Sequence, residues 1–251
     1  MIDWKIHCLD TIDSTNNECR RRAAENEGTV ILSEEQTAGR GRQGRAWNSP
    51  KGKGVWMSLL LKPDLPTETI PQLTLVGAAA VCKAMEKEEG YFPDKIKIKW
   101  PNDIFIREKK AGGILTEMQI SAGRIESVIQ GIGLNVNLAA EDFPDELKAL
   151  ATSFLIETGK VYERERIIAD ILNHFEILYE KFLVGGELGE ALHICRQNSA
   201  VIGRQVRLMN NGTETEAEVL DLGPRGELIV KLGNGRITSV ISGEISLRIQ
   251  S

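Results

Sequence analysis

The segment K-I-K-I-K-W, which ends at Trp100, alternates strictly between charged and large apolar side chains, and this leaves few folds open to the chain. Because successive side chains of a β-strand point to opposite faces, it predicts a strand with Ile96, Ile98 and Trp100 on one face and three lysines on the other. Residues 104–106 and 113–118 then predict a hairpin. The order of these segments indicates neighbouring antiparallel strands.

Helices are predicted on both sides of these strands. Thr15, with Glu18 three residues later, predicts a capping box and a helix that runs to about Asn26. Apolar spacing and turn residues predict further helices at residues 73–90, 167–185 and 188–197, and further strands at residues 29–32, 55–61 and 125–136. Strands in succession that are flanked by helices predict an α+β fold with a mixed, mainly antiparallel sheet.

The pattern changes after Ser199 to short alternating strands separated by turns. The predicted strands cover residues 206–209, 214–222, 228–232, 236–241 and 245–249, and the turns lie at residues 211–212, 224–226 and 233–235. About 50 residues of strand and turn predict a small SH3-like β-barrel. We therefore expect two domains, residues 1–199 and residues 200–251.

Composition excludes several classes of protein. Hydrophobic residues make up 41% of the chain and charged residues 27%, which is a globular balance. No apolar run reaches the ~18 residues of a membrane helix, and the N-terminus does not resemble a signal peptide. The net charge of −5 is the opposite of what a dedicated nucleic-acid binder carries. Four scattered cysteines and three histidines show no zinc spacing, so we expect reduced, mostly buried thiols in a cytoplasmic protein.

Against this acidic background, residues 36–63 contain no acidic residue, six basic residues and five glycines. Glycine lets backbone N–H groups approach a ligand, and arginine binds phosphate or carboxylate. Trp47 and Trp56 can wall an apolar or aromatic ligand. A plain solvent-exposed loop is the alternative interpretation. The pattern Gly39-x-Gly41-x-x-Gly44 is no dinucleotide fingerprint, because no helix pattern follows it, and no G-K-[ST] sequence marks a P-loop.

Three further motifs suit a ligand site, although each is weak alone. In Lys99–Asp103, Pro101 forces a turn after a strand and places Asn102 and Asp103 at the strand end, where their polar groups can face a ligand. The alternative interpretation is that Asn-Asp forms an ordinary turn without a ligand. Lys110 precedes two glycines and can reach a phosphate or a carbonyl group. In Gly131–Asn137, the paired glycines allow close approach of a flat ligand.

Taken together, these motifs resemble those of the biotin–protein ligases, of the monofunctional type without an N-terminal DNA-binding domain. The resemblance rests on Ser14-Thr15-Asn16, Gln36, Gly39–Trp47, Lys99–Asp103, Lys110–Leu115 and Gly131–Asn137, and it extends over nearly the whole chain. It implies a class II synthetase-like catalytic domain that joins biotin to ATP, with Mg²⁺, releases pyrophosphate and forms biotinyl-5′-AMP. It implies transfer of biotin in a second step to a lysine of the biotin carboxyl carrier domain of a carboxylase.

The resemblance also implies roles for individual residues. They are Ser14, Thr15, Asn16, Gln36, Arg40, Gly41, Arg42, Lys110 and Gly112 for biotin; Arg45, Trp47, Asn102, Gly133 and Asn135 for the nucleotide; and Lys110, Arg42 and Asp103 for catalysis. Asp103 is the candidate that orients or deprotonates the incoming lysine, and a metal-binding or structural role is its alternative. No metal ligands are assigned.

The sequence and the resemblance also predict partners. Only thirteen residues precede Ser14, too few for a three-helix DNA-binding unit, and the net charge is −5, so we expect no DNA partner. Because no apolar run has the length of a membrane helix, we also expect no membrane partner. Whether the protein forms a homodimer is left open. Three rival functions remain: transfer of a lipoyl or octanoyl group, a binding module without catalysis, and nucleic-acid binding through the glycine- and arginine-rich segment of residues 38–54, called the basic loop below. The polar Ser14–Asn16 cluster and the arginine-rich loop favour biotin over a simple acyl chain.

Overall fold

The structure is a computed structural model that describes residues 1–86, 96–121, 123–210, 213–241 and 243–247. Its larger part is a seven-stranded sheet with the order β1-β2-β3-β7-β6-β5-β4. The strands are β1 (Lys5–Ile12), β2 (Thr29–Gln36), β3 (Gly54–Leu61), β4 (Ile96–Lys99), β5 (Asp103–Ile106), β6 (Lys109–Ser121) and β7 (Arg124–Asn135). Among the seven strands in the described residues, only β1 and β2 pair in parallel, so the expected mixed, mainly antiparallel sheet is confirmed.

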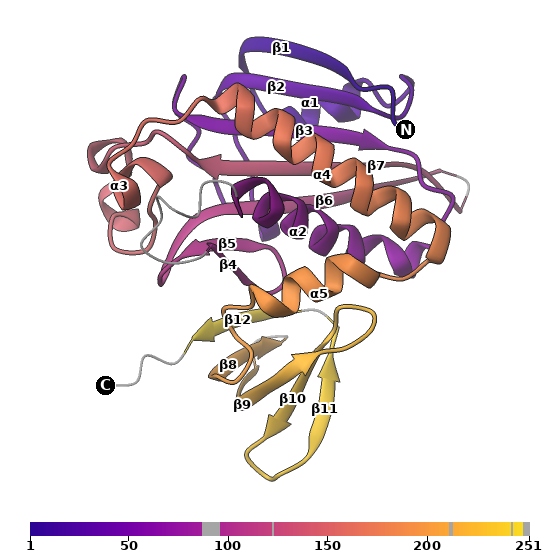
Figure 1. Ribbon diagram of the computed structural model, residues 1–251, viewed down its shortest axis with the longest axis vertical. Coiled ribbons are helices and arrows are strands. Elements are labelled where there is room, and N and C mark those ends of the chain that lie inside the picture. Colours follow the sequence, from indigo (N-terminus) through magenta and orange to yellow (C-terminus); the bar gives the residue numbers. More distant parts are fainter. Residues whose placement is uncertain (87–95, 122, 211–212, 242, 248–251) are drawn as a thin grey trace.

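The two faces of this sheet have different cover. Helices α2 (Leu73–Met85) and α4 (Arg164–Gly185) lie across one face, with α5 (Gly189–Gln197) beside them (Figure 1). Their apolar stripes and alternate strand residues form the main core. The other face carries α1 (Thr15–Arg21), over a small separate cluster of Cys19, Ile31, Leu60 and Ile129. Short helical segments cover Arg42–Gly44, Thr67–Gln72, Ala140–Asp142, Asp145–Leu147 and Phe154–Thr158.

The N-terminal region differs from the sequence prediction. The capping box at Thr15 and Glu18 was wrong, because Ser14 is the N-cap and makes no side-chain cap hydrogen bond. Glu18 instead binds Arg21 and Arg22, each at 2.7 Å, and the helix ends at Arg21 rather than near Asn26. Strand β1 was not predicted. The expected helix end at Gly90 and the turn at residues 211–212 lie outside the described residues.

The C-terminal part is a five-stranded antiparallel sheet with the order β11-β10-β9-β8-β12. Its strands are β8 (Gln205–Asn210), β9 (Thr213–Leu222), β10 (Leu228–Leu232), β11 (Ile237–Val240) and β12 (Glu244–Leu247). In the described ranges, the edge strands β11 and β12 do not pair with each other. A separate C-terminal sheet is therefore confirmed, and its closure into an SH3-like barrel stays a prediction.

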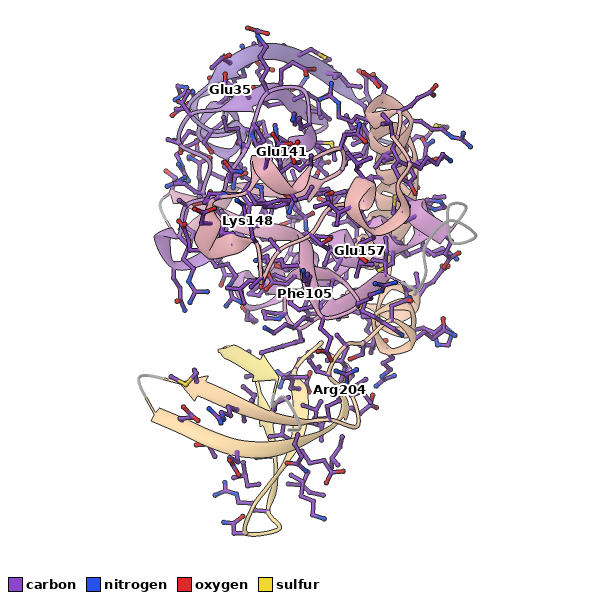
Figure 2. All side chains as sticks on the ribbon, turned by 90° about the vertical axis from the view of Figure 1, so that its left-hand side faces the viewer. Glu35, Phe105, Glu141, Lys148, Glu157 and Arg204 are labelled. Atoms are coloured by element: carbon purple, nitrogen blue, oxygen red, sulfur yellow. The ribbon has the colours of Figure 1, made fainter. Side chains whose placement is uncertain are left out.

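Several contacts join the two sheets. The segment after α5 pairs with β4, because Ile98 N donates to Asn198 O at 2.7 Å and Ala200 N donates to Ile98 O at 2.8 Å. Trp100 Nε1 donates to Gly226 O at 2.8 Å. Arg204 lies at this junction and pairs with Glu108 at 3.4 Å (Figure 2). The apolar core is thus continuous across residue 199, and the division at 199/200 into two domains stays a prediction.

Gly226 provides a direct test of this junction. Its φ of +78° is unfavourable for other residues, and an added Cβ would overlap Leu75 and lie 3.0 Å from Leu188. We expect Gly226→Ala to lower the free energy of unfolding by about 2–4 kcal/mol in urea denaturation, through backbone strain and overpacking together. Gly235→Ala is the matched control, since Gly235 has a φ of +83° and no atom within 4 Å of an added Cβ. Equal losses in the two variants would show that the junction is not tightly packed.

Candidate active site

A cavity of about 630 Å³ opens on the face of the sheet that carries α1. Its wall comes from the N-terminus of α1, the basic loop, the segment after β4, strands β3, β5, β6 and β7, residues 143–151, and one residue of the C-terminal sheet. The lining residues predicted from sequence are Ser14, Thr15, Asn16, Gln36, Arg40, Gly41, Arg42, Arg45, Trp47, Asn102, Asp103, Lys110, Gly133 and Asn135. The fold therefore brings the four sequence motifs to one place.

Glycines form the floor of this cavity. The sheet register places Gly113 opposite Gly133 and Gly131 opposite Ser58. An added Cβ at Gly131 would overlap the Asn16 side chain, and one at Gly133 would lie 2.7 Å from Trp47 Nε1. These positions must remain glycine for the polar and aromatic side chains above them to approach the sheet.

One end of the cavity is a buried polar network. Gln36 Oε1 accepts from both Thr15 N, at 2.8 Å, and Thr15 Oγ1, at 3.1 Å, while Gln36 Nε2 donates to Ser49 Oγ at 2.8 Å. The hydroxyl of Ser58 lies 2.7 Å from Thr15 Oγ1 and 2.6 Å from Asn16 Oδ1. These groups hold one another in fixed orientations, which suits recognition of a small polar head group.

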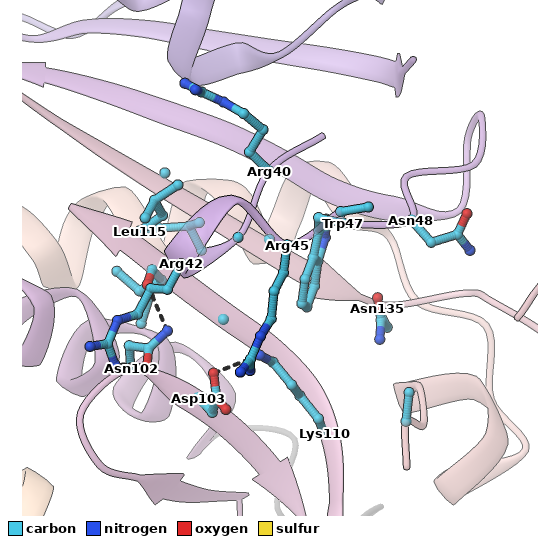
Figure 3. A pocket seen from close by; sticks show the side chains of 18 of the residues that line it. Arg40, Arg42, Arg45, Trp47, Asn48, Asn102, Asp103, Lys110, Leu115 and Asn135 are labelled. Atoms are coloured by element: carbon cyan, nitrogen blue, oxygen red, sulfur yellow. Dashed lines mark hydrogen bonds and ion pairs between the residues drawn. The ribbon is translucent and has the colours of Figure 1, made fainter. Parts of the chain in front are cut away.

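The other end is cationic. Lys110 Nζ lies 2.6 Å from Asp103 Oδ1 and 5.2 Å from the centroid of the Trp47 ring. Arg42 Nη1 donates to Asn102 Oδ1 at 3.0 Å, and Arg42, Arg45 and Lys110 extend to the same side of the loop as Asp103 (Figure 3). Three cations and one carboxylate make this end suitable for phosphate groups and for negative charge that develops in a reaction.

Two predicted residues are placed differently from the others. Arg40 extends away from Arg42, Arg45 and Lys110, toward α1 (Figure 3), and its Nη2 donates to Asn17 Oδ1 at 2.7 Å. Gly112 does not line the cavity. An added Cβ there would lie 2.9 Å from Gly133 O and 3.3 Å from Ile104 Cβ, within the packed sheet, and the assignment of Gly112 to biotin stays a prediction.

Sequence reasoning missed other parts of the site. Ser58 does not line the cavity but contacts Thr15 and Asn16 from beneath. It interrupts the apolar run V-W-M-S-L-L-L of β3, a signal that could have identified it as a functional position. No comparable signal marks Met209, which the C-terminal sheet contributes to the cavity. The remaining wall residues from the segment before α3 (Phe154–Thr158) are Phe143, Leu147, Leu150 and Ala151.

No cysteine is among the residues that line the cavity. None of the four cysteines, all of which lie within the described residues, forms a disulfide; Cys8 is exposed and the other three are buried. Burial raises the pKa of the Cys19 thiol, beneath Ser58, to about 12, so it stays protonated at neutral pH and is a poor nucleophile. Among the described residues, no three His, Cys, Asp or Glu side chains gather in a group that could hold a metal ion.

Comparisons with known proteins agree with this geometry. Residues 8–135 match the model of the biotin/lipoate A/B protein ligase family, and residues 201–248 match the biotin protein ligase C-terminal domain. The bifunctional ligase/repressor BirA of Bacillus subtilis is 41% identical over 95% of this chain and 72% of its own length. The biotin–[acetyl-CoA-carboxylase] ligase of Mycobacterium tuberculosis is 30% identical over 92% of this chain and 85% of its own length.

A solved structure extends the similarity to the whole fold. The biotin protein ligase of Aquifex aeolicus, in complex with biotin and ATP, superposes with a TM-score of 0.82 and 31% identity, over 98% of this chain and 99% of the other. Both parts of the chain are therefore matched by sequence and by fold. The chain belongs to the biotin/lipoate A/B protein ligase family and, within it, to the biotin protein ligases.

Proposed function

We propose that the cavity catalyses both steps of ATP-dependent protein biotinylation. In the first step, a carboxylate oxygen of biotin attacks the α-phosphorus of ATP, the bond to the bridging oxygen breaks, and pyrophosphate leaves. In the second step, a lysine amine of a biotin carboxyl carrier domain attacks the acyl carbon, the bond to AMP breaks, and the amine loses a proton. The observation that carries this proposal is one cavity with a buried polar network at one end and a cationic cluster at the other.

The two ends suggest how the substrates are oriented. The network of Thr15, Asn16, Gln36 and Ser58, with Ser14 beside it, suits the ureido head of biotin, which offers both donors and acceptors. The carboxylate end of biotin would then point toward Lys110, where charge must be neutralised as two anions meet.

The nucleotide lies at the cationic end in this proposal. Arg42 and Arg45 would bind its phosphates, and Trp47, with Asn102, Gly133 and Asn135, would line its remaining site. The Asn135 amide already donates to Thr152 O at 3.0 Å, which fixes its orientation.

Asp103 can act in the second step. Its ion pair with Lys110 holds the carboxylate at the cationic end of the cavity, and in this proposal it orients the attacking amine or accepts its proton. The structural alternative is that Asp103 only positions Lys110. Mg²⁺ usually keeps several water and phosphate ligands, so we assign it to ATP, and no step here depends on a protein-bound metal.

The partners of the enzyme rest on family resemblance. The carrier domain of a carboxylase as acceptor, a homodimer, a cytoplasmic location and the absence of DNA binding stay predictions. In the part of the chain that the structure describes, no helix is long and apolar enough to cross a bilayer.

Pyrophosphate exchange into ATP tests the proposed function. We expect exchange that requires biotin and does not occur with lipoate or octanoate, followed by covalent labelling of a purified carrier domain. Exchange with octanoate or lipoate but not with biotin would identify the other branch of the family and overturn the proposal.

Gly131 offers a test of the polar end. An added methyl group would displace the Asn16 side chain, so we expect Gly131→Ala to raise the KM for biotin about tenfold, at the ~1–3 kcal/mol scale of an overpacked site. The matched control is Gly185→Ala at the end of α4, where an added Cβ meets no atom within 4 Å. A Gly131→Ala enzyme with an unchanged KM for biotin would place the head group elsewhere.

A further inference from the structure

Glu117 of β6 lies behind the cavity and connects three separate segments. Its Oε2 accepts from Asn16 Nδ2 at 2.7 Å. Its Oε1 lies 3.1 Å from Arg20 Nη2 and 3.5 Å from Arg40 Nη2. Arg40 belongs to the basic loop, while Asn16 and Arg20 belong to α1, so one carboxylate joins the loop, the helix and the sheet. Glu117 itself does not line the cavity.

The contact with Asn16 fixes the orientation of that amide. A carboxylate is only an acceptor, so the Asn16 NH₂ group must face Glu117 and the Oδ1 must face Ser58, which lies 2.6 Å away. Asn16 is only 4% exposed, so the orientation of its amide decides what the polar end of the cavity presents.

The contact with Arg40 anchors the basic loop. Arg40 and Arg20 both donate to Asn17 Oδ1, at 2.7 and 2.9 Å, and both lie next to Glu117 Oε1. Two guanidinium groups this close repel each other unless a carboxylate lies between them. Removal of the Glu117 charge would leave this repulsion uncompensated and weaken the hold on Arg40, although its hydrogen bond to Asn17 would remain. Arg40 extends away from Arg42, Arg45 and Lys110, and so away from the cationic end of the cavity (Figure 3).

We propose that Glu117 is a positioning residue that couples the biotin site to closure of the basic loop. One carboxylate oxygen orients Asn16 and the other holds Arg40, so the polar end of the cavity and the loop share a single anchor. Arg40 acts as a loop anchor in this proposal. The inference deepens the proposed function and rests on it for its activity measurements.

Conservative variants separate the two roles of the carboxylate. Glu117→Gln keeps an acceptor for Asn16 but loses the charge, so we expect a KM for biotin within about threefold of wild type. Loss of the ion pair should raise escape of biotinyl-AMP, measured as the ratio of poly-lysine labelling to carrier labelling, about two- to fivefold. Glu117→Ala loses both contacts and should raise the KM for biotin about tenfold as well.

Four other variants locate the effect. Arg40→Met should reproduce the increased escape, and the Glu117→Gln/Arg40→Met double variant should show no further increase, since both changes break one contact. Arg20→Met should leave escape and the KM for biotin at wild-type values, as should Glu126→Gln, which alters an exposed glutamate of the neighbouring strand β7. Equal effects of Arg20→Met and Arg40→Met, or additive effects in the double variant, would overturn the proposal, because Glu117 would then only stabilise α1.

Limited trypsin digestion tests the anchor without any activity. Cleavage after Arg42 and Arg45 in the substrate-free protein should be about two- to fivefold faster in Glu117→Gln than in wild type or Glu126→Gln, because loss of a partly exposed ion pair raises loop opening by that factor. An unchanged rate of cleavage in Glu117→Gln would contradict the claim that Glu117 anchors the basic loop, even if biotin-dependent exchange is intact. A wild-type protein without biotin-dependent exchange overturns the proposed function instead, and the digestion result still decides the anchor.

Discussion

Replacement of Lys110 by alanine should lower the kcat of biotin-dependent pyrophosphate exchange by about 10²–10³, the loss typical of one donor to developing charge. The effect should fall on kcat and not on biotin binding, because the ammonium group stabilises charge that builds up only as the carboxylate meets the α-phosphate. The variant also leaves Asp103 without the partner that now lies 2.6 Å away, so a carboxylate would face the phosphates.

The unpaired Asp103 carboxylate in Lys110→Ala allows a second measurement. Addition of Asp103→Asn to Lys110→Ala should recover part of the exchange rate, since it removes the uncompensated negative charge. Lys109→Ala is the control, because Lys109 is the adjacent exposed lysine of the same strand. Normal turnover with weakened biotin binding in Lys110→Ala would contradict the assigned role, and Lys110 would then be a substrate-binding residue only.

Local sequence patterns predicted those elements of the site whose structure depends on residues close together in the chain. The alternation at residues 95–100, the hairpin of β5 and β6, and the glycines of the loop and of β7 are all visible in the sequence, because pleat, turn and close approach each require particular residue types. These are the elements that bring Asp103, Lys110 and Gly133 together.

What the sequence could not show depends on partners far apart in the chain. The hydroxyl of Thr15 looks like a helix cap, but Gln36, 21 positions away, takes its hydrogen bond. Glu117 reads as one more polar residue in an amphipathic strand, yet Asn16 lies 101 positions away. Strand β1 is an exposed edge strand without clean alternation, and only its pairing with β2 defines it. Long-range hydrogen bonds leave no periodic signal, so they could not be predicted.

The loop that carries Arg42 should control whether the activated intermediate stays bound. Arg42 Nη1 donates to Asn102 Oδ1. Two hydrogen bonds fix Asn102 in turn: its Nδ2 donates to Ile114 O at 3.1 Å, and Ile114 N donates to the Asn102 backbone carbonyl at 2.9 Å. The loop is thereby tied to a rigid strand end beside the cationic cluster. In the proposed mechanism, Arg42 also binds the phosphate of biotinyl-AMP.

Replacement of Arg42 by glycine should separate the two half-reactions. Pyrophosphate release should continue, because Lys110 and Arg45 remain, while the loss of a charge-assisted contact of ~1.5–3 kcal/mol should speed escape of biotinyl-AMP about tenfold or more. The freed mixed anhydride acylates any accessible lysine, so the ratio of bystander labelling to carrier labelling should rise by the same factor.

The adjacent residue Gln43 distinguishes charge from flexibility. Gln43 is exposed and lies in the same helical turn with a φ of +56°, so Gln43→Gly adds backbone freedom to the loop without removing a charge or a bond to Asn102. Both variants are incubated with ATP, biotin, a carrier domain and an unrelated lysine-rich protein. If Gln43→Gly labels bystanders as strongly as Arg42→Gly, loop flexibility alone releases the intermediate. If only Arg42→Gly does so, retention depends on the guanidinium group and on its tie to Asn102.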